Sequence, residues 1–142
     1  DCDISTKFFF QPAQPGEAAG IAIFYNNLNY YTFLFTMEDT NATALTLTSC
    51  EKGIPTVIKS QPVNQNPLFL KVEIRHQKIQ FFFRTSSESW ISFGEPVSGT
   101  MLNKENGGGF TGTYMGIYAS SHGQPSTSYA DFQWFEYLPL LT

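Results

Sequence analysis

The acidic residues are the first candidates for chemistry, because hydrolysis of a glycoside usually needs two carboxyl groups about 5–9.5 Å apart. The candidates are Glu38 and Asp39 in a turn, Glu73 and Glu136 in expected strands, and Asp131. Neighbours in an extended chain point to opposite faces, so Glu38 and Asp39 do not make such a pair. No spacing rule selects another pair. We therefore interpret these carboxylates as surface or turn-capping groups.

Two histidines and two cysteines are the remaining candidates for catalysis or metal binding. His76 occupies an expected hairpin turn and His122 a loop rich in Ser and Gly, so we expect exposed turn residues rather than partners of a catalytic nucleophile. Isolated histidines and distant cysteines also lack the close spacing of a zinc site. We expect no cofactor, although a structural calcium stays open, because calcium ligands need no regular spacing.

Cysteine usage and one sequon bear on the compartment. Cys2 and Cys50 fit either a disulfide or two free buried thiols, and the sequence leaves both open. Asn41 begins the glycosylation sequon Asn-Ala-Thr in the polar, turn-like stretch EDTNATA. Together these signals favour a secreted protein.

The stretch GGGFTGTYMG, from Gly107 to Gly116, is rich enough in glycine to suggest a ligand-binding loop. No GK[ST] follows it, and the next residues are typical of a strand rather than of the helix that a phosphate site would use. We therefore interpret it as a tight turn that enters a strand.

Composition and charge narrow the class of protein and its partners. With 142 residues, 42% of them hydrophobic, the chain suits one domain with a single core. Its 14 Phe and 7 Tyr favour pleated, two-sided burial. The net charge is −4, and eight scattered Lys and Arg form no basic stripe, so we expect no nucleic-acid partner. No apolar run approaches the ~20 residues of a membrane span, and DCDISTKFFF lacks the regions of a signal peptide.

Short runs rich in Phe, Tyr, Val, Ile and Thr recur between turn signals, and no segment keeps a 3.6-residue apolar pattern. This organisation predicts an all-β fold, an antiparallel sandwich or barrel in one domain. The expected strands are Ile4–Gln11, Ala18–Tyr25, Tyr30–Met37, Ala44–Glu51, Thr56–Ser60, Leu68–Arg75, Lys78–Arg84, Trp90–Phe93, Thr111–Ser120 and Ala130–Leu138.

The hairpin LFLKVEIRHQKIQFFFR shows the clearest alternation. One set of its residues is apolar and should face the core. The other set carries Phe69, Phe82, Glu73 and Arg75, which predicts a mixed face that could contact a sugar or a neighbouring domain. The alternative is a solvated outer face with two partly covered rings.

Three motifs together resemble the C-terminal sandwich of glycoside hydrolase family 43, the β-xylosidase and arabinofuranosidase group. They are EAAGIAIFYNNLNYYTFLFT (Glu17–Thr36), GGGFTGTYMGIYA (Gly107–Ala119) and YADFQWFEY (Tyr129–Tyr137). Their order and spacing cover nearly the whole chain.

The resemblance implies a concanavalin-like β-sandwich, a jelly roll, that in the family follows a five-bladed β-propeller. The catalytic carboxylates of the family belong to that propeller, so no acidic residue of this chain is expected to be catalytic. In the family the sandwich packs on the propeller, and one of its loops carries an aromatic side chain to the sugar pocket. By motif position that residue is Phe110; the alternative is a hydrophobic plug at the rim of its own sandwich.

These observations lead to an accessory, non-catalytic domain of a family 43 glycosidase acting on xylan- or arabinose-containing saccharides. Its expected partners are the catalytic propeller and an oligo- or polysaccharide, with neither nucleic acid nor membrane. One alternative is a stand-alone carbohydrate-binding module or lectin, which would stack sugars on exposed aromatic rings. Another is an independent hydrolase, which would need a carboxylate pair in a cleft. The rings considered for the binding module are Phe69, Phe82, Tyr30, Tyr31 and Trp90.

Overall fold

The computed structural model describes residues 1–39, 41–85, 89–102 and 113–140. Within these ranges the regular elements are strands and one short 3₁₀ turn, and no helix is long and apolar enough to cross a bilayer. In chain order they are β1 (Cys2–Phe10), β2 (Ala18–Asn26), β3 (Asn29–Met37), β4 (Thr43–Glu51), β5 (Ile54–Pro62), β6 (Leu68–Arg75), β7 (Lys78–Arg84), β8 (Ile91–Ser92), β9 (Val97–Ser98), η1 (Thr100–Leu102), β10 (Tyr114–Ser120) and β11 (Ala130–Pro139).

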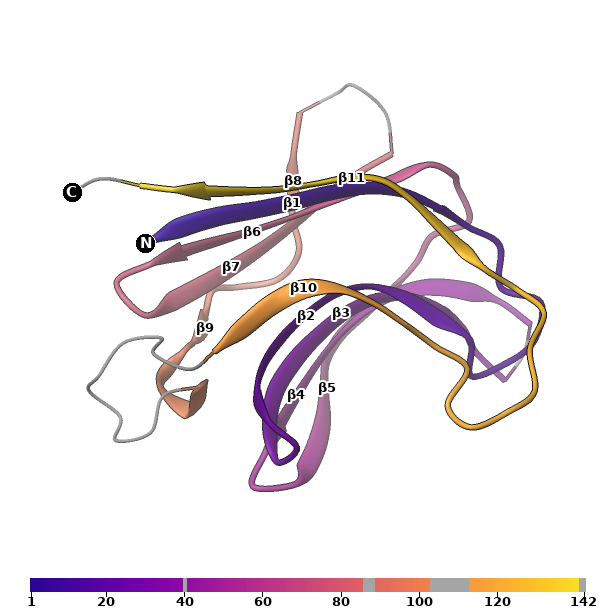
Figure 1. The fold of residues 1–142 in the computed structure, drawn as a ribbon, viewed down its shortest axis with the longest axis horizontal. Coiled ribbons are helices and arrows are strands. Elements are labelled where there is room, and N and C mark those ends of the chain that lie inside the picture. Colours follow the sequence, from indigo (N-terminus) through magenta and orange to yellow (C-terminus); the bar gives the residue numbers. More distant parts are fainter. Residues whose placement is uncertain (40, 86–88, 103–112, 141–142) are drawn as a thin grey trace.

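Two antiparallel sheets lie face to face (Figure 1). Sheet A has the order β11-β1-β6-β7-β8, with β9 also paired to β7, and sheet B has the order β10-β2-β3-β4-β5. The chain changes sheet after β1, β5, β9 and β10. As a result the first and last strands, β1 and β11, pair directly with each other. The predicted antiparallel sandwich is therefore confirmed.

The hairpin of β6 and β7 has the register that its alternation predicts. Leu68, Leu70, Val72 and Ile74 are buried, whereas the residues between them are half-buried on the outer side. At its tip, His76 and Gln77 both have positive φ, of 51° and 64°, as the two central residues of a type I′ turn do. This turn matches the right-handed twist of the strands, and it assigns His76 a structural position.

Most predicted strands are present, and the clear failures are at very short strands. For the expected strand Thr111–Ser120, the structure has β10 from Tyr114, and residues 111–112 lie outside the described ranges. Trp90–Phe93 was expected as a strand, but only Ile91–Ser92 (β8) pairs, and Val97–Ser98 (β9) was not expected. Two residues are too few to show an alternating pattern in the sequence. Such strands form because the edge of β7 has free backbone groups with which they can pair.

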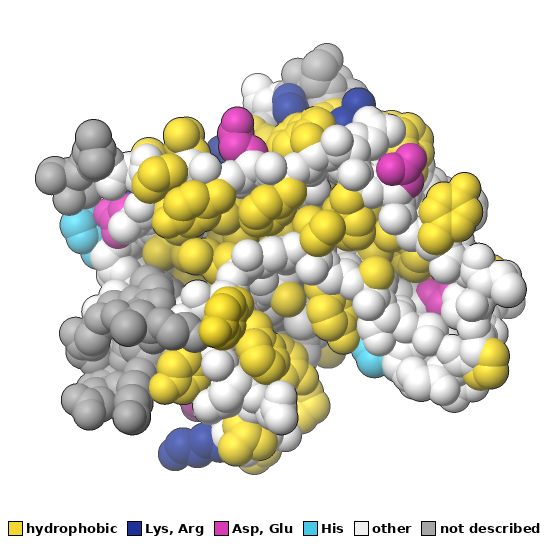
Figure 2. Space-filling model, viewed as in Figure 1, with side chains coloured by type: hydrophobic (Ala, Val, Ile, Leu, Met, Phe, Trp, Pro, Cys, Tyr) yellow, Lys and Arg dark blue, Asp and Glu magenta, His cyan; other side chains and the backbone are white. Residues whose placement is uncertain are grey.

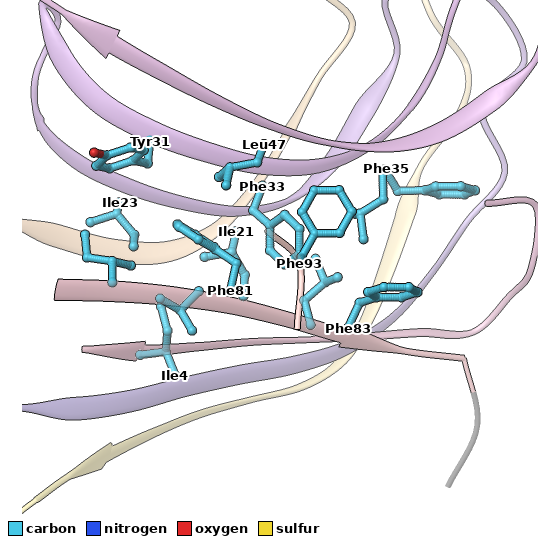
Figure 3. Packing of buried hydrophobic residues seen from close by; sticks show 14 of the residues in the cluster. Ile4, Ile21, Ile23, Tyr31, Phe33, Phe35, Leu47, Phe81, Phe83 and Phe93 are labelled. Carbon is cyan, nitrogen blue, oxygen red and sulfur yellow. The ribbon is translucent and has the colours of Figure 1, made fainter. Parts of the chain in front are cut away.

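The core fills the space between the sheets with aromatic and branched side chains (Figure 3). Phe33 of sheet B is fully buried, and its ring centroid lies 5.1 Å from both Phe81 of sheet A and Phe93. Tilted and edge-on ring contacts of this kind are favoured over face-to-face stacking. Phe33 is thus the point at which the two sheets and the segment after β8 meet.

One polar group is accommodated at the edge of this core. The hydroxyl of Tyr31 donates to the carbonyl of Ser98 at 2.7 Å, so the buried phenol keeps a partner. Burial, with a smaller effect from the Glu51 carboxylate, raises the pKa of Tyr31 to about 12. Tyr31 therefore stays neutral and connects β3 to the end of β9.

The AAG motif at the start of β2 has a packing reason. A Cβ atom on Gly20 would lie 2.2 Å from the backbone oxygen of Phe33 in the neighbouring strand. Real side chains do not approach a carbonyl so closely, so only glycine lets β2 and β3 pair here.

Phe33→Ala should destabilise the domain by about 3–5 kcal/mol, because it removes a large buried ring and leaves a cavity between the sheets. Urea unfolding followed by fluorescence measures the change in the free energy of unfolding. Phe9→Ala is the matched control, because Phe9 is 38% exposed on β1. Equal losses for the two variants would contradict the central position of Phe33.

Candidate functional site

The four residues predicted to share a mixed face do lie together on the outer side of sheet A. Phe69, Glu73 and Arg75 point outward from β6, and Phe82 opposes Lys71 across the β6–β7 pair. The Lys71 ammonium is 3.0 Å from Glu73, and Arg75 is 2.8 Å from Asp3. These side chains are half-buried, and ion pairs that keep contact with water contribute little to stability.

Cations lie over the aromatic rings of this face. The Arg84 guanidinium is 4.6 Å from the Phe69 ring centroid and 4.5 Å from that of Trp90. Lys71 lies 4.7 Å from the Phe82 ring. Such a contact is worth about 0.5–1 kcal/mol at an exposed site and more where the groups are desolvated, and the side chains here are half-buried. A sugar stacking on these rings would have to compete with cations of the same chain.

The two cysteines are free, buried thiols, so the disulfide considered from the sequence is not present. Cys2 faces the core from sheet A. Cys50 opposes Tyr30 in sheet B, on the side turned away from the core. Bridged cysteines have Cα atoms about 4.4–6.8 Å apart, and here sheet B itself lies between the thiols. Burial raises the pKa of the Cys2 thiol, which keeps it protonated.

The remaining candidates are spread over the surface. Asn41 is exposed in a turn with φ of 63°, and glycosylation there stays a prediction. Phe110 lies outside the described residues. Glu136 opposes Ser5 and Asp131 opposes Phe9, so the register does not bring these two carboxylates side by side. Among the described residues no group of three His, Cys, Asp or Glu is placed to hold a metal ion.

Glu17, a residue not singled out from the sequence, is the best-connected carboxylate among those described here. It is 2% exposed at the start of the EAAG motif. Its Oε1 accepts from the Ala13 amide at 2.7 Å and from the Ser128 hydroxyl at 2.8 Å, and its Oε2 accepts from Ser126. The carboxylate therefore joins the loop before β2 to the loop between β10 and β11.

These donors also set the charge of Glu17. The hydrogen bonds from Ser126 and from the Ala13 amide hold the pKa of Glu17 below 4.5, although burial acts in the opposite direction. Both oxygens of Glu17 accept hydrogen bonds from these two loops, so its carboxylate connects the loops and has a structural role rather than that of an acid or base. The nearby His122 also contacts this region, through Nδ1 and the carbonyl of Gly16.

Glu17→Gln should lower the free energy of unfolding at pH 7 by about 1–3 kcal/mol, because charged hydrogen bonds become neutral ones. The folded-state pKa of Glu17 is below that of the unfolded chain. Its contribution is therefore complete above pH 4.5 and is lost as the pH falls through the folded-state pKa. Urea unfolding at pH 7 and at a series of lower values measures the difference between wild type and variant.

The control for this experiment is Glu136→Gln, which changes an exposed carboxylate on β11. If the loss of unfolding free energy caused by Glu17→Gln were the same in acid as at pH 7, Glu17 would not act through its ionised form.

Among the described residues, an apolar edge of the sandwich is left uncovered along β10 and β11, which are the edge strands of sheets B and A. Ile117 of β10 opposes the buried Ile21, and Tyr137 of β11 opposes the buried Ile4. Directly opposed residues share a face, so both side chains turn toward the space between the sheets. Ile117 is nevertheless 49% exposed and Tyr137 53% exposed.

Phe135, 40% exposed, and the half-buried Met115 complete this surface, which we call the open edge. In Figure 1, β10 and β11 lie in front of their sheets. Figure 2 has the same view and shows hydrophobic side chains gathered along this side of the molecule. The sequence signal for this edge was available: the core-facing positions of both strands are apolar. What the pattern did not show is that no third layer covers them among the described residues.

Comparison with known proteins assigns the fold to a family. A family model described as the beta xylosidase C-terminal concanavalin A-like domain matches residues 1–138. The chain belongs to this family. The resemblance of its three motifs to the family 43 sandwich is thereby confirmed.

Relatives of this concanavalin A-like domain are named as glycosidases. A non-reducing end α-L-arabinofuranosidase of Bacteroides ovatus is 30% identical over 134 residues, which cover 94% of this chain and 25% of the relative. A xylosidase/arabinosidase of Butyrivibrio fibrisolvens is 27% identical over 126 residues, which cover 89% of this chain and 24% of the relative. The crystal structure of a GH43 protein from Bacillus licheniformis superposes with a TM-score of 0.86 at 28% identity, over 96% of this chain and 27% of that one.

The domain thus spans about a quarter of the length of the relatives that it matches. The family to which the domain belongs is, by its description, a C-terminal domain of beta xylosidase.

Proposed function

We propose that this domain is the accessory sandwich of a family 43 glycosidase acting on xylan- or arabinose-containing saccharides, and that it packs on the catalytic propeller of its parent chain. The observation that carries the proposal is the open edge. Ile117, Phe135 and Tyr137 face inward from the last two strands, yet each keeps 40% or more of its surface exposed. Apolar side chains at a sheet edge mark an interaction surface.

The choice of partner follows from the length of the relatives. Three quarters of each glycosidase that the chain matches lies outside the matched part. A domain of the same chain is always present at high effective concentration, so a modest apolar patch is sufficient to hold it. In this arrangement the sandwich packs against the propeller and helps to enclose its sugar pocket, and the propeller carries out the chemistry.

Ile117→Asp in the parent enzyme should weaken the packing of the two domains by about 1.5–3 kcal/mol, the value of one buried aliphatic side chain. Scanning calorimetry measures the result: the wild type should unfold both domains in one transition, and the variant should show a separate, lower transition for the sandwich. Ile54→Asp is the matched control, because Ile54 is 68% exposed on β5, at the opposite edge of sheet B. Identical thermograms for the two variants would exclude docking at the open edge.

Phe110 is proposed to help close the sugar pocket of the propeller, as its motif position implies. Phe110→Ala in the parent enzyme should reduce kcat/KM for a small glycoside on the order of tenfold, since one apolar contact with the substrate is lost. The unfolding midpoint should not change. Steady-state kinetics with Phe110→Tyr as the conservative variant checks this, and unchanged kinetics for Phe110→Ala would remove the residue from the site.

A further inference from the structure

A groove of about 700 Å³ runs over the side of sheet B that faces away from sheet A. In Figure 1 the strands of this sheet arch, and the hollow side of the arch is turned away from sheet A. The residues that line the groove alternate along each strand with those of the core and so point to the other face of the sheet. In β3, Thr32 and Leu34 line the groove, and they lie between the core residues Tyr31, Phe33 and Phe35. The volume is within the range of small-ligand sites, about 300–1,000 Å³.

Three aromatic rings line this groove. Phe24 and Tyr30 oppose each other across β2 and β3, with ring centroids 6.0 Å apart and planes inclined by only 25°. Tyr118 joins them from β10, where it opposes Gly20. Phe24 is 37% exposed and Tyr118 38% exposed, so both offer a ring surface to solvent. The cation–ring contacts of the described residues are made instead by Phe69, Phe82, Trp90 and Phe93, which lie outside this groove.

Between the rings most of the lining side chains are small or carry a hydroxyl group. Ala18 and Ala22 of β2 contribute small side chains, and threonines of β3 and β4 lie beside them: Thr32, Thr36, Thr46 and Thr48. The Thr36 hydroxyl already donates to the Glu17 carbonyl, and the Thr46 hydroxyl is 3.0 Å from that of Ser60. The lining also includes Asn27 and His122, but no Lys, Arg, Asp or Glu. Such a surface offers ring faces and hydroxyl hydrogen bonds but no ion pair, which suits a neutral, hydroxyl-rich ligand.

Tyr30 contributes a neutral ring to this arrangement. The neighbouring Cys50 thiol, followed by burial, raises the pKa of Tyr30, so the phenol stays neutral. Its ring lies beside that of Phe24.

We propose that this groove binds a neutral saccharide chain, with sugar rings stacked on Phe24, Tyr30 and Tyr118 and sugar hydroxyls bonded to the threonines of β3 and β4. The choice of a saccharide rests on the family to which the domain belongs, but the site does not depend on docking at the open edge. The domain would then hold polysaccharide on a surface of its own, separate from the pocket of the propeller. This site differs from the outer face of sheet A, which the sequence offers as one possible sugar contact.

Affinity electrophoresis of the parent protein tests the site, with soluble arabinoxylan cast into the gel and a gel without polysaccharide as reference. The wild type should be retarded by arabinoxylan and not by polygalacturonate, which is anionic. Phe24→Ala and Tyr118→Ala should each weaken the retardation by about 3- to 10-fold in apparent affinity, the effect of one lost stacking contact. Tyr129→Ala is the matched control, because Tyr129 is 81% exposed and lies outside the groove lining.

Thermal unfolding of each variant shows whether its fold is intact, and Tyr118→Leu keeps apolar volume without the flat ring if the alanine variant fails to fold. An unretarded wild type, or retardation by polygalacturonate equal to that by arabinoxylan, would overturn the proposal. So would retardation that is unchanged in both Phe24→Ala and Tyr118→Ala. These outcomes are read from migration alone, so they are independent of the calorimetric test of docking.

Discussion

The structure depends on one constraint, the burial of the inward faces of two sheets against each other. Ile4, Ile21, Phe33 and Phe81 lie on the faces that meet, and each is almost fully buried. A strand with one buried face has its register fixed, because a slip of one residue would turn its apolar set to solvent. The outward-facing residues are not constrained by packing in the core, so their side chains can serve other contacts. Every candidate functional surface of this domain is an outward face or an edge.

One end of the sandwich and one of its sides differ in how they are closed. At the end, the Glu17 carboxylate joins the loop before β2 to the loop before β11 through the Ala13 amide and the hydroxyls of Ser126 and Ser128. Along the side made by β10 and β11, inward-facing residues remain partly exposed because no further strand covers them among the described residues. The described part of the sandwich therefore has one apolar edge that is only partly covered.

The outer faces of the two sheets are chemically unlike, although both carry aromatic residues. On sheet A, Lys71 and Arg84 lie over Phe82 and Phe69, so the rings are engaged within the chain. On sheet B, Phe24 and Tyr30 contact each other and are lined by small and hydroxyl-bearing neighbours. The alternating pattern places aromatic residues on both faces, but it says nothing of what lies over each ring.

The sequence by itself determined the all-β class, most strand positions, the faces of the β6–β7 hairpin and the family, because these follow from local alternation, turn residues and motif order. It also predicted that Phe69, Phe82, Glu73 and Arg75 share a face, which the register confirms. Only the tertiary structure decided that Cys2 and Cys50 lie on opposite sides of sheet B, that Glu17 joins two loops and that the edge at Ile117 is open. Those features depend on segments more than a hundred residues apart or on different sheets, and distances between such segments are set by how the sheets pack, which no local pattern encodes.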